Sequence, residues 1–274
     1  MWSILLHLFP ASLYAGLWLY YWRAQPAGQG AAAIGMANNE RLVLFLALCA
    51  HGLALHSAIF SSGEMRFGFS TALSLIVWLA ICFYWVETLY ARLGGLRAIV
   101  LPVGALACLL TAFVPGNHVL SDINVASPVF RIHFVTTMLA NSLVMLAALH
   151  ALLMALATWQ LHRARFSRAL ANLPPLLTME ALLFRLIGIA FVLLTLALAT
   201  GIIFTEIRYG QVFRLTHETV LGSVSWLMFG VLLAGRYFRG WRGRTALRWT
   251  MVGFITTMLA YIGSRFVIEV LLHR

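Results

Sequence analysis

Two histidines stand where an imidazole could act on a bound group. His133 is the second residue of a long apolar run, and His217 is the first residue of another. A neutral imidazole offers one nitrogen lone pair to a metal ion or, as an axial ligand, to heme iron, while a hydrogen-bond acceptor orients its other nitrogen. A histidine at the end of a membrane helix can instead bond only to water and lipid headgroups. The spacing alone leaves both interpretations open.

Charged residues lie beside these histidines or at a similar depth. Glu218 is in the first turn after His217, where the positive end of a helix dipole favours a carboxylate, and Thr216 is a predicted N-cap. Arg265 and Glu269 are four residues apart, so they can pair on one helix face. Because charges at this depth are costly, we expect the pair to face the protein interior, either as a structural ion pair or as an anchor for an acidic ligand group.

These residues belong to apolar runs that are each about 20 residues long, enough at ~1.5 Å per residue to cross a hydrocarbon layer of about 30 Å. No run alternates as a transmembrane strand does. With 62% hydrophobic and 10% charged residues, the composition excludes a soluble domain. The sequence predicts an all-α, polytopic integral membrane helical bundle that forms one transmembrane domain, residues 1–274. The eight predicted helices cover residues 2–22, 42–60, 67–90, 96–114, 132–158, 181–204, 217–236 and 246–272.

All nineteen basic residues are arginines, and they gather in alternate gaps between the runs. Twelve lie in the first, third, fifth and seventh gaps, against four in the other three. The positive-inside rule places the odd gaps in the cytoplasm. Both termini, His133 and His217 are then predicted to be extracytoplasmic. The first run is predicted to be a retained helix, because no positive charge precedes it and Arg23 follows it.

Several other kinds of chemistry find no support in the sequence. The net charge of +11 is spread over loop ends without interleaved aromatic residues, which favours contacts with the lipid bilayer over nucleic acid. Cys49, Cys82 and Cys108 stand singly, with neither a C-x-x-C pair nor zinc spacing. We find no paired carboxylates at a pocket, no nucleophile with its base and no phosphate loop, so we expect no enzymatic activity.

The last third of the chain contains a series of short motifs. They are His217-Glu218-Thr219, Ser225-Trp226-Leu227-Met228-Phe229, Gly240-Trp241-Arg242-Gly243-Arg244, Gly253-Phe254 and Tyr261-Ile262-Gly263. With these motifs the chain resembles the cytochrome c assembly membrane protein family (CcsA/HemX-like), and within it the YpjD-like inner membrane protein branch. The resemblance covers residues 130–272 and reaches the first four helices only by topology. It implies a multi-pass protein of the bacterial cytoplasmic (inner) membrane that handles heme on the outer side.

The resemblance also implies a heme site, with one departure. His133 matches an external heme-ligand histidine of the family, and His273 lies one residue from the position of a second. Other members carry a tryptophan-rich heme motif immediately before the stretch that corresponds to His217-Glu218-Thr219. This motif is missing here. Here residues 209–216 read Tyr-Gly-Gln-Val-Phe-Arg-Leu-Thr, so the flat aromatic surface for a porphyrin is reduced. The predicted site has His133 and His217 as possible iron ligands, with Arg265, Glu218 and His273 as further heme-binding residues.

Three functions are compatible with these features. The first is a heme-binding protein that assists cytochrome c assembly, with heme and other assembly or membrane proteins as partners. The second is a scaffold or regulator that keeps the fold without heme. The third is a small-solute transporter, for which His51 and Asn141 are the candidate polar groups near the middle of the membrane.

Overall fold

The computed structural model of the chain describes residues 2–23, 35–60, 65–91, 95–114, 119, 127–162, 175–210 and 215–267. These residues are almost entirely helical, and their only β-type contact is an isolated bridge between Arg66 and Val119. The all-α prediction is therefore confirmed. In chain order the elements are α1 (Trp2–Arg23), α2 (Asn38–Ile59), α3 (Phe69–Tyr90), α4 (Arg97–Phe113), α6 (Pro128–His162), α7 (Leu176–Tyr209), α8 (His217–Arg239), α9 (Arg244–Met258), the π-helical turn η1 (Leu259–Gly263) and α10 (Ser264–Phe266).

Six of the described helices are long and apolar enough to cross a membrane, namely α1, α2, α3, α6, α7 and α8. Helix α4 is apolar but has only 17 residues, and the last predicted span is divided among α9, η1 and α10. A multi-pass helical membrane protein is thus confirmed. The count of eight spans and the outer location of both termini stay predictions.

Two helices extend well beyond the predicted boundaries. Helix α6 has 35 residues, where the hydropathy pattern predicted 132–158, and α7 has 34 residues in place of 181–204. Both helices begin next to a proline: Pro128 is the first residue of α6, and Pro175 is the N-cap of α7. Proline suits a helix start because its missing N–H has no intrahelical partner there. At ~1.5 Å per residue each helix exceeds a hydrocarbon thickness of about 30 Å, so polar flanks continue the helix past the apolar run.

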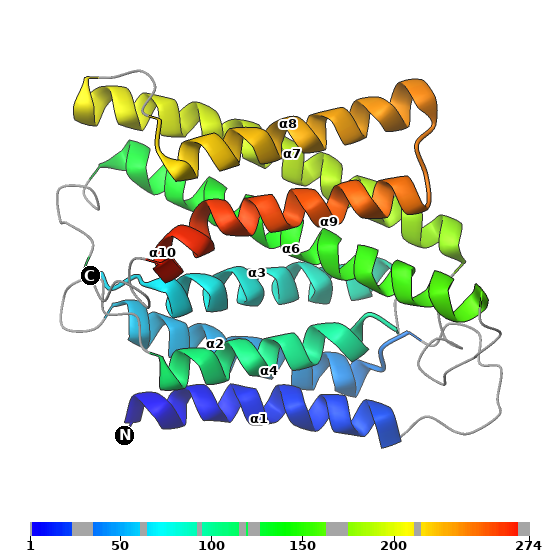
Figure 1. The fold of residues 1–274 in the computed structure, drawn as a ribbon. Helices are drawn as coiled ribbons and strands as arrows, with labels where there is room; N and C mark the ends of the chain where they lie inside the picture. The colour runs from blue at the N-terminus through cyan, green and yellow to red at the C-terminus, as the bar shows by residue number, and fades with distance from the viewer. Residues whose placement is uncertain are drawn as a thin grey trace.

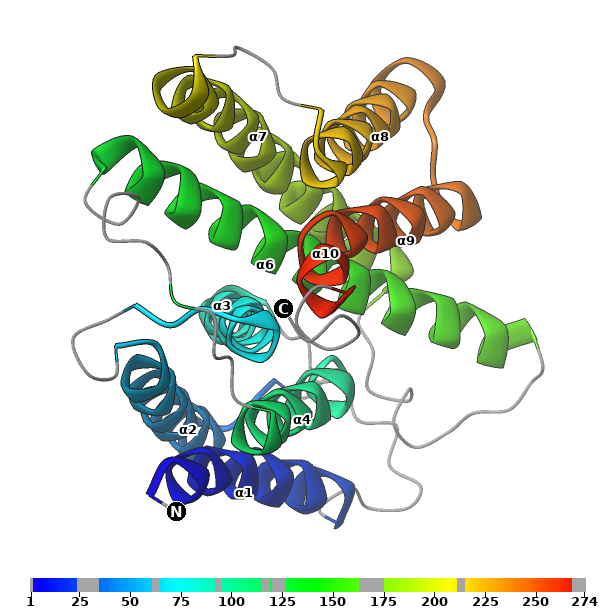
Figure 2. The same cartoon turned by 60° about the vertical axis from the view of Figure 1, so that its left-hand side comes forward.

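The helices form two groups of four. In the first group α1 packs against α2 and α4, and α3 also packs against both. In the second group α6, α7, α8 and α9 contact one another in a closed ring, in that order. Figures 1 and 2 show α1 to α4 on one side of the molecule and α7 to α9 on the other, with α6 between them. Contacts between α3 and α6 form the main junction of the two groups.

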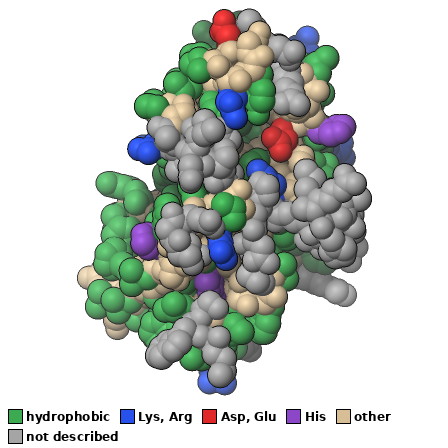
Figure 3. Space-filling model, turned by 90° about the vertical axis from the view of Figure 1, so that its left-hand side faces the viewer, with side chains coloured by type: hydrophobic (Ala, Val, Ile, Leu, Met, Phe, Trp, Pro, Cys, Tyr) green, Lys and Arg blue, Asp and Glu red, His purple; other side chains and the backbone are tan. Residues whose placement is uncertain are grey.

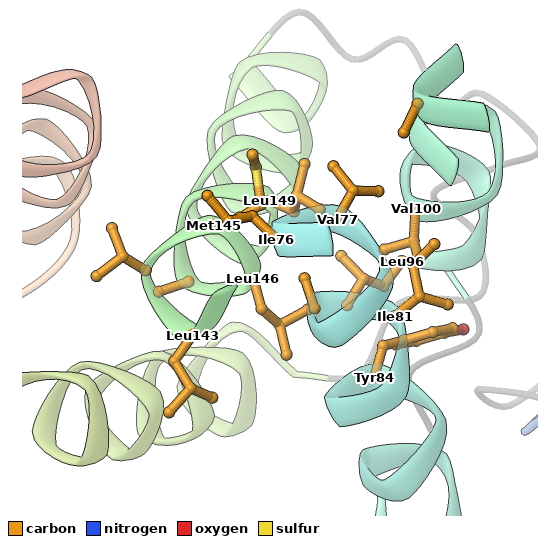
Figure 4. Packing of buried hydrophobic residues seen from close by; sticks show 14 of the residues in the cluster. Ile76, Val77, Ile81, Tyr84, Leu96, Val100, Leu143, Met145, Leu146 and Leu149 are labelled. Atoms are coloured by element: carbon orange, nitrogen blue, oxygen red, sulfur yellow. The ribbon is translucent and has the colours of Figure 1, made fainter. Parts of the chain in front are cut away.

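Helix α6 is the most enclosed of the candidate spans. Its most apolar window is 72% buried, against 22% for α7 and α8. Small residues such as Ala140, Ala147 and Ala151 are fully buried and allow close approach of neighbouring backbones. Figure 4 shows side chains of α3, including Ile76 and Ile81, between those of α6 on one side and those of α4 on the other.

Polar side chains inside the groups are paired across helix boundaries. The Tyr14 hydroxyl of α1 lies 3.3 Å from Nδ1 of the fully buried His51 in α2, and Nε2 of that ring lies 2.9 Å from the Ser74 hydroxyl of α3. A hydroxyl that donates to Nδ1 leaves Nε2–H to donate to Ser74, so a neutral ring satisfies both contacts. His51 was a candidate for a solute path, and its two ring nitrogens are instead used to connect three helices.

A second polar contact joins the two groups themselves. His150 of α6, with a side chain that is 0% exposed, approaches Glu87 of α3 with 2.9 Å between Nε2 and Oε2. Its donor Nε2–H compensates a carboxylate that is largely removed from water. The α3–α6 junction therefore contains a specific polar contact as well as apolar packing.

We expect His150→Leu to lower the free energy of unfolding by about 3 kcal/mol, because the buried Glu87 carboxylate loses its donor. The double variant Glu87→Leu/His150→Leu removes the unpaired carboxylate as well, and we expect it to recover most of this loss. Thermal unfolding of the detergent-purified variants measures both effects. A double variant as unstable as the sum of the two single variants would contradict this account.

Candidate functional site

The predicted site residues that the structure describes, His133, His217, Glu218 and Arg265, lie at one end of the second helix group. Helices α6 and α8 begin at this end, and α7 and the segment from α9 to α10 finish there. It is the left-hand side of Figure 1, and Figure 3 faces it, with arginine, acidic and histidine side chains among apolar ones. We call it the outer end, after the orientation predicted from the arginines.

His133 has the most defined environment of the predicted residues. Its Nδ1 lies 2.9 Å from the backbone carbonyl of Ala197 in α7 and 3.3 Å from the Thr200 hydroxyl. A carbonyl oxygen can only accept, so Nδ1 must carry the hydrogen. In the neutral ring Nε2 then bears the lone pair. This is the arrangement by which a second-sphere acceptor fixes the tautomer of a metal-binding histidine.

Glycine makes this approach possible. A Cβ placed on Gly201 would lie 3.0 Å from Cε1 and 3.3 Å from Nδ1 of His133. Almost any other residue at position 201 would therefore push the imidazole away from the Ala197 carbonyl. Sequence reasoning did not predict a role for Gly201, because only the packing of α7 against α6 shows which residue faces the ring.

Phenylalanines surround the start of α6 on two sides. The Phe134 ring meets Phe67 edge-on at 4.9 Å between centroids, and the Phe130 ring lies 5.5 Å from Phe204 of α7. Phe130 and Phe134 are also stacked on each other, 6.1 Å apart. His133 thus projects from a helix turn rich in aromatic carbon. This cluster was not predicted, because aromatic residues were sought only at 209–216, although phenylalanines flank His133 closely in sequence.

His217 and Glu218 occupy the exposed first turn of α8, as predicted. Thr216 is the N-cap, and its hydroxyl accepts from the backbone N–H of Thr219 at 3.2 Å. The cap confirms where the helix begins. It leaves the side chains of His217 and Glu218 at the outer surface.

Arg265 lies close enough to Glu218 of α8 for the two opposite charges to influence each other. The turn that precedes it, η1, is π-helical and packs against α8. A π-helical turn contains an extra residue, so it rotates the following side chains relative to an uninterrupted α-helix, and such turns are frequent at functional sites. Neither the π-helical turn nor the proximity of Arg265 to Glu218 was predicted. The predicted partner Glu269 lies outside the described residues.

The two predicted iron ligands, His133 and His217, do not lie on neighbouring helices. Helix α6 packs against α3, α7 and α9, whereas α8 packs against α7, α9 and η1. Helices α6 and α8 therefore occupy opposite corners of the ring, with α7 and α9 at the other two (Figure 2). The predicted ligand pair His133 and His217 has its members across the ring from each other, while Glu218 and Arg265 are brought together. His273 lies outside the described residues.

Comparison with known proteins identifies the family. Residues 39–272 match the cytochrome C assembly protein family. The chain belongs to this family. The match takes in α2, α3 and α4, and so reaches further towards the N-terminus than the resemblance of residues 130–272 indicated.

Two relatives of this cytochrome c assembly family member match most of its length, and a third matches about a third of it. The inner membrane protein YpjD of Escherichia coli K12 is 30% identical over 223 residues, which are 81% of this chain and 83% of the relative. A 28.8 kDa protein of Azospirillum brasilense is 29% identical over 286 residues, covering 98% and 96% of the two chains. The cytochrome c biogenesis protein CcsA of Gloeobacter violaceus is 29% identical over 92 residues, which are 34% of this chain and 27% of that protein.

The relatives and the helices agree on location. The family member described here is a multi-pass protein of the cytoplasmic (inner) membrane, as predicted, because its relative YpjD is an inner membrane protein and its own helices are long and apolar.

Labelling of single cysteines will test which end faces outward. With the native cysteines replaced by alanine, we expect His217→Cys to react in intact spheroplasts with a maleimide that cannot cross the membrane. We expect Arg239→Cys, at the other end of α8, to react only after lysis. Both residues are exposed, so burial does not explain a difference. The opposite labelling pattern would reverse the orientation predicted from the arginines.

Proposed function

We propose that this protein binds heme at the outer end of its second helix group and assists cytochrome c assembly there, without a catalytic reaction of its own. The proposal includes eight membrane spans with both termini outside. The observation that carries it is the geometry of His133, whose Nδ1–H is fixed on the Ala197 carbonyl so that Nε2 is the nitrogen left to bind iron. Membership of the cytochrome c assembly family supports the same function.

The chemistry of the residues suits heme in three respects. His133 offers a neutral imidazole nitrogen, the ligand type that holds heme iron in many proteins. Phe130 and Phe134 offer apolar carbon beside it, which a porphyrin face requires. Arg265 offers a cation of the kind that pairs with carboxylates such as the heme propionates. Bound heme would supply an iron atom with axial positions to fill, and the protein would supply orientation and charge.

The remaining predicted residues have secondary roles in this proposal. His217 is exposed and lies across the ring from His133. It serves either as a second ligand for a heme held between α6 and α8, or as the ligand that binds heme first as it enters the site. Glu218 places a negative charge near Arg265, and a heme propionate would take over this interaction with the cation. His273 keeps the role that the family resemblance implies, as a further external ligand.

A scaffold that keeps the fold without heme is the second candidate. The absence of the tryptophan-rich motif from residues 209–216 favours it, because a porphyrin then loses its usual aromatic platform. The two candidates differ in one observable property, the retention of heme by the purified protein.

Titration with hemin will distinguish them. We expect the detergent-purified protein to develop a Soret band, and His133→Ala to weaken hemin binding at least 10- to 100-fold, the range typical even for lost second-sphere partners. Gly201→Val should also weaken binding, by about 10-fold or more, because the added side chain displaces the imidazole from the Ala197 carbonyl.

His56→Ala is the matched control, since His56 is an exposed histidine in the other helix group. It should leave the Soret titration unchanged. If wild-type protein gives no Soret band after hemin addition, or if His133→Ala/His217→Ala retains the wild-type band, the heme proposal is wrong and the scaffold function is favoured.

A further inference from the structure

The turn between α8 and α9, at the end of the molecule opposite His133, is unusually basic and well fixed. Residues 236–248 contain no acidic residue. Gly240 and Gly243 take positive φ angles of 64° and 55°, a conformation that suits glycine, and the Trp241 ring packs where Gly235 has no side chain. We call residues 236–248 the basic hairpin. Its five arginines are Arg236, Arg239, Arg242, Arg244 and Arg248.

One buried carboxylate binds two of these arginines and holds them against the start of α7. Glu180, at the start of α7, is only 7% exposed. Its Oε1 accepts from Arg236 at 2.6 Å and from Arg242 at 3.0 Å, and its Oε2 accepts from the backbone N–H of Gly243 at 3.4 Å. The carboxylate thus organises the turn but neutralises only one of the five positive charges.

Arg248 lies on an exposed face of α9. It is exposed and begins a row of exposed residues, continued by Val252, Ile255 and Leu259. The spacing of four, three and four residues places this row on one helix face. Since the rest of the row is apolar and long enough to contact acyl chains, Arg248 lies where that face meets the headgroups.

The end of α8 has the same arrangement. Val220, Val224, Leu227 and Val231 form its exposed apolar row, and Phe238, seven residues after Val231, continues it with 79% of its side chain exposed. Arg239 follows directly and is also exposed. The adjacent Tyr237 is 83% exposed, and tyrosines at the end of a membrane helix mark the headgroup level.

We propose that the basic hairpin is a binding site for an anionic phospholipid, in which Arg239 and Arg248 hold the headgroup phosphate while the apolar rows of α8 and α9 receive the acyl chains. Helices α8 and α9 pack against each other, so the two rows belong to one hairpin. Arg248 begins the exposed row of α9, and Arg239 directly follows the last residue of the α8 row in sequence. Arginines at the ends of lipid-facing rows favour a lipid over a soluble acidic partner, for which we would expect arginines that face away from the membrane. Basic pockets between helix ends are known to bind anionic headgroups in this way.

Native mass spectrometry will test the site. The detergent-solubilised full-length protein is titrated with phosphatidylglycerol or with phosphatidylcholine of the same acyl chains. We expect the wild type to bind phosphatidylglycerol more tightly. The double variant Arg239→Gln/Arg248→Gln should lower that affinity about 5-fold for each arginine removed, and about 25-fold in all, without changing phosphatidylcholine binding.

Arg131→Gln/Arg208→Gln is the control, because it removes the same charge from exposed residues at the outer end. It should leave phosphatidylglycerol affinity at the wild-type value. Equal losses in both double variants would reduce the effect to overall charge and overturn the proposal. Equal affinity of the wild type for the two lipids would also overturn it and leave the hairpin arginines to a soluble partner or to topology alone.

Discussion

A polar group inside hydrocarbon must be satisfied by another part of the protein, and this constraint determines how the helices of this protein meet. Three histidines illustrate it. His51 connects three helices of the first group, His150 connects the two groups, and His133 connects α6 with α7. In each case the partner comes from a different helix, so the polar contact selects a register between helices that apolar packing alone defines poorly.

The same three histidines show why His133 is the functional candidate. Both nitrogens of His51 are used by Tyr14 and Ser74. His150 uses Nε2 for Glu87, and its other nitrogen, Nδ1, is buried, so a ligand cannot reach it. His133 also uses one nitrogen, yet it is half-buried near the outer end, where a ligand can approach. His133 therefore differs from His51 and His150 because its ring is held in a fixed orientation and its second nitrogen is accessible to a ligand.

Much of the architecture follows from one-dimensional patterns. Apolar runs of about 20 residues predicted the helices, and Thr216 before His217-Glu218 predicted where α8 begins. Which helices become neighbours could not be predicted, because lipid-facing and protein-facing surfaces are both apolar and give no strong hydropathy signal. For this reason the sequence did not reveal that His133 and His217 lie on helices at opposite corners of the ring. For the same reason the contact of Gly201 with His133 was not predicted. The π-helical turn before Arg265 has no simple sequence signature either.

Glu180 holds α8 and α9 together at the basic hairpin, at the end of the second helix group opposite the outer end. Glu180 fixes the end of α8 through Arg236 and the start of α9 through Gly243. Arg236 follows Glu218 by 18 residues in α8, so at ~1.5 Å per residue the fixed point lies about 27 Å from Glu218. Because a helix of this length is stiff, clamping both helices at the basic hairpin limits how far Glu218 and Arg265 can move apart at the outer end. Within those limits, the π-helical turn sets the final rotation of Arg265.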